Sequence, residues 1–135
     1  MKKGLIITIG VLGLFYVIGI MSPTVANEKA NAKKEVINST PKEIVAEFEA
    51  NEIRAESKFS GKIVKIKGII ETIGVGIDSY VLISDGNKSE VRISLKDKSQ
   101  GVNLNKGDSI TFFAEYSSYT LGIVSLKNGK VGAYQ

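Results

Sequence analysis

The sequence of 135 residues contains neither cysteine nor histidine. Without cysteine the chain has no disulfide bond, so burial and backbone pairing alone must hold it together, and it has no acceptor for an attached lipid. Without histidine it lacks the usual general base, the usual zinc ligand and every Ser-His or Cys-His pair. These absences argue against hydrolase and zinc chemistry, and we expect no enzyme activity, no cofactor and no metal site.

The chain also lacks a strong excess of positive charge once its N-terminus is set aside. It has 18 Lys and Arg against 14 Asp and Glu, a formal net charge of +4. Lys2 and Lys3 precede a long apolar run and every acidic residue follows it, so the remainder has two fewer basic residues and a net charge of +2. Proteins that bind nucleic acid non-specifically neutralise phosphates with a strongly basic surface. The near balance argues against nucleic acid as a partner.

One long hydrophobic run is present, at residues 4–21. Its length lies between the roughly 15 residues of a signal-peptide core and the roughly 20 residues of a membrane-spanning helix. Residues 1–26 are therefore either a signal peptide, cleaved after Ala26, or an uncleaved transmembrane anchor that makes the membrane a partner. Lys2 and Lys3 favour a cytoplasmic N-terminus in both cases, which puts the rest of the chain on the extracytoplasmic side.

Residues 27–38 are polar and of mixed charge, and they predict a linker ahead of a domain over residues 39–135. Thr40, Pro41 and Glu43 have the pattern of a helix start, with a hydroxyl N-cap, a proline at the first helical position and a capping-box glutamate. We expect one α-helix to begin there. Three apolar residues define its buried face: Ile44, Val45 and Phe48.

From residue 62 onward the hydrophobic pattern changes to a period of two, which is typical of half-buried β-strands. Turn residues such as Gly, Asp and Asn separate the alternating segments. The pattern predicts five strands, over residues 62–73, 80–84, 90–95, 109–116 and 122–127. Gly68 lies inside the first of them, where it fits a bend that lets one long strand serve both sides of a small barrel.

Several ordered pieces of this pattern resemble the tRNA-anti-like group of bacterial OB-fold proteins. They are the run Glu43–Gly74, Tyr80–Ile83 with its turn glycine, Lys106-Gly107-Asp108, and Val124–Asn128. The resemblance covers about residues 41–128. It implies a five-stranded OB-fold barrel preceded by one N-terminal α-helix, and an envelope protein of the kind that carries a lipid anchor. This chain departs from the group in lacking the lipid-acceptor cysteine.

The outward parity of the first three strands offers a candidate ligand-binding face. OB-folds commonly bind ligands across their second and third strands and the adjoining loops. An aromatic ring and a guanidinium plane can stack on a base or a sugar, and lysines can meet anionic groups. The candidate residues are Lys65, Lys67, Tyr80 and Arg92, although an ordinary solvated sheet face is the favoured interpretation of the same positions.

Three more aromatic residues are secondary candidates. Phe113 has the outward parity of the fourth strand, so either the helix covers it or it marks a contact patch. Tyr116 and Tyr119 fall in an expected Tyr/Ser loop before the fifth strand, a composition that suits adaptable recognition as well as a packed hairpin.

Two functions of different classes follow from these features. The first is a non-enzymatic binding or interaction module of the cell envelope, with a protein, a peptide or a glycan as its ligand. The alternative is an OB-fold protein that binds single-stranded oligonucleotides through the candidate face.

Overall fold

The computed structural model describes residues 34–132, and in it the chain is mainly β. The elements, in chain order, are β1 (Val36–Ser39), α2 (Pro41–Ala50), α3 (Glu52–Phe59), β2 (Ile63–Val75), β3 (Ser79–Ser84), β4 (Glu90–Leu95), the 3-10 helix η2 (Lys98–Gly101), β5 (Ser109–Thr120) and β6 (Ile123–Val131). The predicted signal peptide or anchor, its cleavage site at Ala26 and residues 27–33 lie outside the described part. None of the described helices is both long and apolar enough to span a bilayer.

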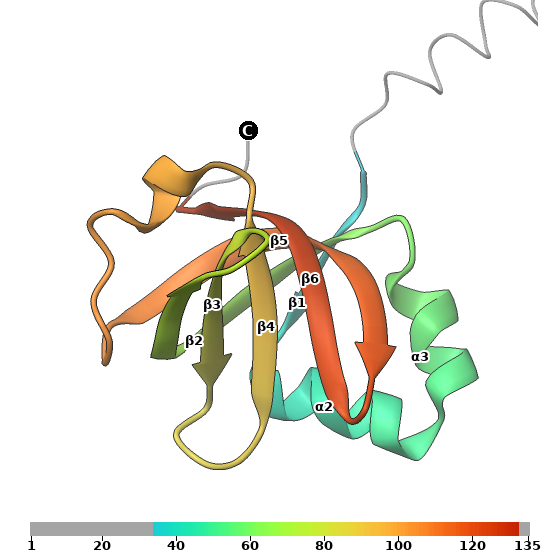
Figure 1. Cartoon of the computed structure of the whole chain (residues 1–135). Helices are drawn as coiled ribbons and strands as arrows, with labels where there is room; N and C mark the ends of the chain where they lie inside the picture. Colours follow the sequence, from blue (N-terminus) through green and yellow to red (C-terminus); the bar gives the residue numbers. More distant parts are fainter. Residues whose placement is uncertain (1–33, 133–135) are drawn as a thin grey trace, which may run out of the picture. The chain divides into compact units, whose positions relative to one another are not determined.

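Strands β2 to β6 form the closed five-stranded barrel that the sequence predicted (Figure 1). Their order is β2-β3-β4-β6-β5, and β5 pairs back onto β2. β2 can close the barrel because Ile63–Ile69 pairs with β5 and Ile69–Val75 pairs with β3. The register of the second pairing shifts between Ile70 and Thr72, and such a bulge bends the strand between its two halves.

Gly68 lies next to this bend, and its missing side chain lets β3 approach closely. A Cβ atom at Gly68 would lie 2.9 Å from the carbonyl oxygen of Ser84 and 3.1 Å from the Cβ atom of Ile83. Ser84 itself is fixed, because it is fully buried, its hydroxyl donates to the carboxylate of Glu71, and the same oxygen accepts the Gly86 N–H at 3.1 Å. The predicted role of Gly68 in the bend of a long strand is confirmed.

The single predicted helix is in fact two helices, divided at Asn51. The N-cap prediction is confirmed, since the Thr40 hydroxyl accepts the Glu43 N–H at 3.1 Å. Asn51 then has an extended backbone with φ −164° and ψ 99°, which ends α2. Its side-chain oxygen accepts the Arg54 N–H at 2.9 Å, so the same residue caps the start of α3. Asparagine competes for backbone donors in this way, which disfavours it inside a helix and favours it at a cap.

A short strand, β1, was missed by the sequence analysis. Residues 36–38 fall within the predicted linker, but they pair in parallel with β2, where Val36 lies opposite Ile63 and Ser39 opposite Ile66. The Glu35 carbonyl extends this pairing by accepting the Ile63 N–H at 2.8 Å. β1 lies at the edge of the sheet, and its side chains are exposed or half-exposed. A strand in this position does not need a buried apolar face, so the polar residues around it did not indicate a strand.

The barrel interior is filled by the parity of β2 that the sequence predicted, with Val64, Ile66 and Ile70 all buried. Figure 1 shows α2 lying across one end of the barrel. The ring of Phe48, on α2, stacks there on Tyr116 and Tyr119 of β5, with centroid separations of 5.2 Å and 5.0 Å. The helix therefore seals this end of the barrel with aromatic side chains.

We expect Gly68→Ala to lower the free energy of unfolding by about 1–3 kcal/mol, because the added methyl group meets the backbone of β3. Urea unfolding of the variant and the parent chain measures the difference. Gly76→Ala is the matched control, since a Cβ atom there meets nothing within 4 Å. Equal stability of the two variants would contradict the close-packed bend.

Candidate binding site at the mouth of the barrel

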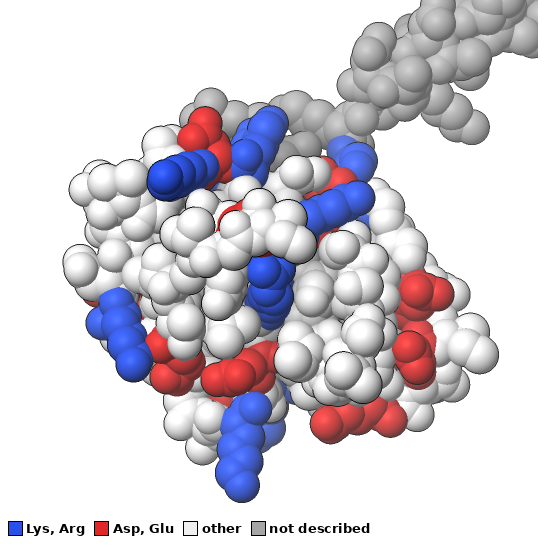
Figure 2. All heavy atoms as spheres, in the orientation of Figure 1, with Lys and Arg blue, Asp and Glu red and all other residues white. Residues whose placement is uncertain are grey.

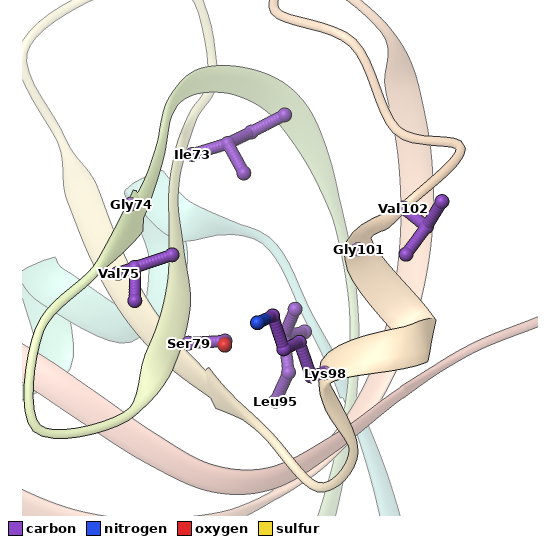
Figure 3. A pocket seen from close by; sticks show the side chains of 8 residues that line it. All are labelled: Ile73, Gly74, Val75, Ser79, Leu95, Lys98, Gly101 and Val102. Carbon is purple, nitrogen blue, oxygen red and sulfur yellow. The ribbon is translucent and has the colours of Figure 1, made fainter.

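The end of the barrel away from α2 holds an apolar pocket of about 150 Å³, which we call the mouth pocket (Figure 3). Its walls come from the last residues of β2, the first residue of β3, the last residue of β4, and η2 with the residue after it. The lining residues are Ile73, Gly74, Val75, Ser79, Leu95, Lys98, Gly101 and Val102. Largely apolar concavities with a few polar groups are the usual form of a small-ligand site.

The pocket exists because the inward parity of β2 continues beyond the filled core. Past the bulge, Ile73 lies opposite the buried Val81, and Val75 lies opposite Ser79. Val75 is 76% exposed and Val102, across the pocket, is 73% exposed. Within residues 34–132 no α-helix covers these side chains as α2 covers the other end, so the apolar lining is exposed.

The opposite wall, η2, is held in place by side-chain contacts to the backbone. The carboxylate of Asp97 caps it by accepting the Ser99 N–H at 2.9 Å, and this hydrogen bond lowers the pKa of Asp97. The side-chain oxygen of Gln100 accepts the Val131 N–H at 2.9 Å and so ties η2 to β6. The wall that carries Lys98 is therefore anchored at both ends.

Two polar side chains reach the pocket, Lys98 and Ser79. Figure 3 shows the nitrogen of Lys98 and the hydroxyl oxygen of Ser79 directed into the same region, next to Leu95. Within residues 34–132, neither side chain forms a hydrogen bond or an ion pair. Both groups can donate hydrogen bonds, so the pocket presents an apolar wall together with two donors.

The outer face of β3 and β4, with the connection between β2 and β3, carries a polar cluster that we call the Arg92 cluster: Asp78, Tyr80, Arg92 and Ser94. The guanidinium carbon of Arg92 lies 4.3 Å from the centroid of the Tyr80 ring. Its two terminal nitrogens donate to Asp78 Oδ1 and to Ser94 Oγ, each at 2.9 Å. Hydrogen bonds first from Ser94 and then from Arg92 lower the pKa of Asp78.

Because Gly74 has no side chain, the Tyr80 ring can pack directly against the backbone of β2. A Cβ atom at Gly74 would be 2.4 Å from Cζ of Tyr80, so any larger residue would displace the ring. Tyr80 is thus in contact with Gly74 and also with the guanidinium of Arg92. A flat ligand that approaches the Tyr80 ring would therefore contact the Arg92 guanidinium first.

The predicted candidate face is divided between two parts of the barrel. Tyr80 and Arg92 come together, as described above. Lys65 and Lys67 lie on the half of β2 that pairs with β5, opposite Phe113 and Thr111. The second half of the same strand pairs with β3. Because β2 bends between its two halves, Lys65 and Lys67 do not join the Arg92 cluster.

Of the secondary candidates, Tyr116 is a core residue and the predicted loop is strand. β5 continues to Thr120, so Tyr116 and Tyr119 lie within it. Tyr116 is 9% exposed and its hydroxyl donates to Glu56 at 3.4 Å, and burial followed by the Glu56 charge raises its pKa. Tyr119 is partly buried against Phe48. Phe113 is half-buried, with the ammonium of Lys65 5.8 Å from its ring centroid.

Charged side chains of both signs are spread over the face that Figure 2 shows. Acidic side chains gather over the helical part of the molecule, and lysines and arginines are interspersed with acidic and uncharged side chains. The described residues also contain no group of three His, Cys, Asp or Glu side chains that could hold a metal ion. The most distinctive site is therefore the mouth pocket.

The sequence analysis missed this pocket, although a signal for it is present. Val75 at the end of β2 and Ile77 in the connection to β3 are 76% and 108% exposed, where a turn usually has polar residues. Apolar side chains that are left exposed in a cluster point to a contact surface. Only the fold brings Val75 to the same pocket as Val102, which is more than 20 positions away in the sequence.

The closed five-stranded barrel defines a domain of the OB-fold class, and comparison with known proteins identifies the family. The model of the tRNA_anti-like family matches residues 1–130, so the chain belongs to that family. No curated protein is significantly similar in sequence.

Two solved structures are similar in fold. A "putative nucleic acid-binding lipoprotein" from Klebsiella pneumoniae subsp. pneumoniae MGH 78578 is 21% identical, with a TM-score of 0.59 over 82% of this chain and 97% of that one. Yeast Stn1 and Ten1 match at 15% identity and a TM-score of 0.41, over 76% of this chain and 82% of that one. At 21% identity the first likeness establishes the fold of the chain.

The Arg92 cluster predicts a measurable dependence on pH. The pKa of Asp78 is lower in the folded chain than its ordinary value of 3.8, so the ionised carboxylate stabilises the fold at higher pH. That contribution is lost as the pH falls below 3.8 and through the folded-state pKa. We expect Ser94→Ala to raise the pKa of Asp78, as followed by NMR titration of its carboxyl carbon. An unchanged titration would contradict the hydrogen bond from Ser94.

Proposed function

We propose that this chain is a non-enzymatic binding module of the cell envelope, which holds its ligand in the mouth pocket on the extracytoplasmic side of a membrane. The observation that carries the proposal is the apolar pocket of about 150 Å³ with Lys98 and Ser79 as its two donors. The apolar segment at residues 4–21, preceded by two lysines, supports the placement. The absence of histidine and cysteine from the sequence supports a binding role.

In this proposal the Arg92 cluster positions the ligand site without touching the ligand. Asp78 lies in the connection between β2 and β3, where its carbonyl accepts the Gly76 N–H at 2.8 Å. Its carboxylate is joined to Arg92 on β4, so the loop is fastened to the neighbouring strand. The other side of the same hairpin supplies Ile73, Val75 and Ser79 to the pocket. A fixed hairpin preserves the shape of the pocket, which limits the entropy lost on binding.

The second candidate is binding of single-stranded nucleic acid by the outer face of β3 and β4. The name of the Klebsiella protein and the general use of OB-folds favour it. The exposed part of the Arg92 guanidinium could stack on a base. Against it stand the nearly balanced charge of the chain after Lys3, at +2, and the partner that Arg92 already has in Asp78. Lys65 and Lys67, which would have to join such a face, lie on the other half of β2.

Site-specific photocrosslinking tests the location of the ligand. A benzophenone side chain placed at Val102, on the rim of the pocket, is expected to crosslink to the ligand in cells, with the product identified by mass spectrometry. The matched control is Ile53 on α3, which is 80% exposed and lies outside the pocket. Crosslinks of the same kind and yield at both positions would contradict the proposed location of the ligand site.

An oligonucleotide titration separates the two candidates. We expect the full chain to show no salt-dependent change in the anisotropy of labelled single-stranded DNA or RNA at micromolar protein, because the part of the chain after Lys3 has a net charge of only +2. Binding that weakens steeply as salt is raised, and that is lost in Arg92→Ala while Lys98→Gln retains it, would instead support the second candidate.

A further inference from the structure

The mouth pocket also indicates the chemical class of its ligand, an inference that rests on the function proposed above. Its volume of about 150 Å³ is the first constraint. An apolar protein cavity of about this volume accommodates benzene. The pocket walls are the aliphatic side chains of Ile73, Val75, Leu95 and Val102, so the group that enters should be apolar and about the size of one phenyl ring.

The charge at the pocket is the second constraint. Lys98 lines it, and within the described residues no carboxylate pairs with this ammonium. The neighbouring Asp97 uses its carboxylate to cap η2, through the Ser99 N–H. Asp78, on the other side of the hairpin, is joined to Arg92. Lys98 therefore has no ion-pair partner among the described residues, which favours an anionic ligand.

The hydroxyl of Ser79 supplies the third constraint. It lines the same pocket and, among residues 34–132, it has no hydrogen-bond partner for its side chain. One ammonium and one hydroxyl can each donate to a different oxygen of a carboxylate. A doubly charged phosphate would be left with one positive charge nearby, so the site matches a monoanion better.

We propose that the mouth pocket binds a carboxylate that carries an apolar group about the size of a phenyl ring. The ring lies between the β2–β3 hairpin and Val102, while Lys98 and Ser79 hold the carboxylate. Two sources have this chemistry, a free arylalkanoic acid and the C-terminal residue of a peptide that ends in phenylalanine. Both present an apolar side group a few bonds away from a carboxylate.

The test follows the methyl groups of Ile, Leu and Val by NMR in the full chain, held in phosphatidylcholine nanodiscs. Titration with 3-phenylpropionate should produce saturable shifts at Ile73, Val75, Leu95 and Val102. Lys98→Gln should weaken this binding by about tenfold, the size expected for loss of one charge-assisted hydrogen bond. Lys96→Gln is the matched control, because Lys96 is exposed on the same segment but does not line the pocket, and it should leave the affinity unchanged.

The neutral alcohol 3-phenylpropanol separates the ring from the charge, and it should bind the parent chain and Lys98→Gln equally weakly. Gly-Gly-Phe, with a free or an amidated C-terminus, distinguishes the source. Tighter binding of the free peptide than of 3-phenylpropionate supports a peptide ligand, and the reverse order supports a free acid.

Equal affinity for acid and alcohol, or an unchanged affinity in Lys98→Gln, would overturn the proposed ligand class while leaving a binding pocket in place. Absence of any pocket shift at millimolar concentrations of all four compounds would overturn it as well. The crosslinking at Val102 does not presuppose the ligand, so its outcome decides the proposed function separately.

Discussion

The double pairing of β2 is the constraint on which the rest of the structure depends. This barrel closes through one strand that both sides share, because β2 pairs with β5 along its first half and with β3 along its second. The strand must bend sharply in between, and the bulge at Ile70–Thr72 and the bare backbone of Gly68 allow it to do so.

The two ends of the barrel differ as a consequence. The first half of β2 begins directly after α3, so the helices lie at that end, and Phe48 fills the opening by stacking on aromatic residues of β5. The second half of β2 extends beyond the filled core and carries Ile73 and Val75 to the other end. At that end the short 3-10 helix η2 lines the opening and leaves Ile73 and Val75 exposed. The bend that closes the barrel thus also leaves an apolar opening.

Local patterns in the sequence were sufficient to predict the five strands, because each strand carries its own alternation and ends at turn residues, and the resemblance to the tRNA-anti-like group implied that they close into a barrel. Patterns could not show that Asn51 divides the helix, since an asparagine cap depends on one backbone conformation. They also placed Lys65 and Tyr80 on one face, because parity along a strand does not register a bend. The mouth pocket was beyond reach for a similar reason. Its walls combine the ends of three strands with Val102, and only the closed barrel brings these together.

The two faces of the β2–β3 hairpin have different roles in the site. On the outer face, Gly74 admits the Tyr80 ring, and Arg92 joins that ring to Asp78 in the loop. The residues that looked most suitable for stacking on a ligand are thereby engaged with one another. On the inner face, Ile73 and Val75 lack such partners and remain exposed. The contacts on the outer face restrict the motion of the hairpin, and the exposed apolar side chains lie on its inner face. A ligand that covers these apolar side chains gains free energy from their burial, so the inner face has more binding free energy to offer than the outer face.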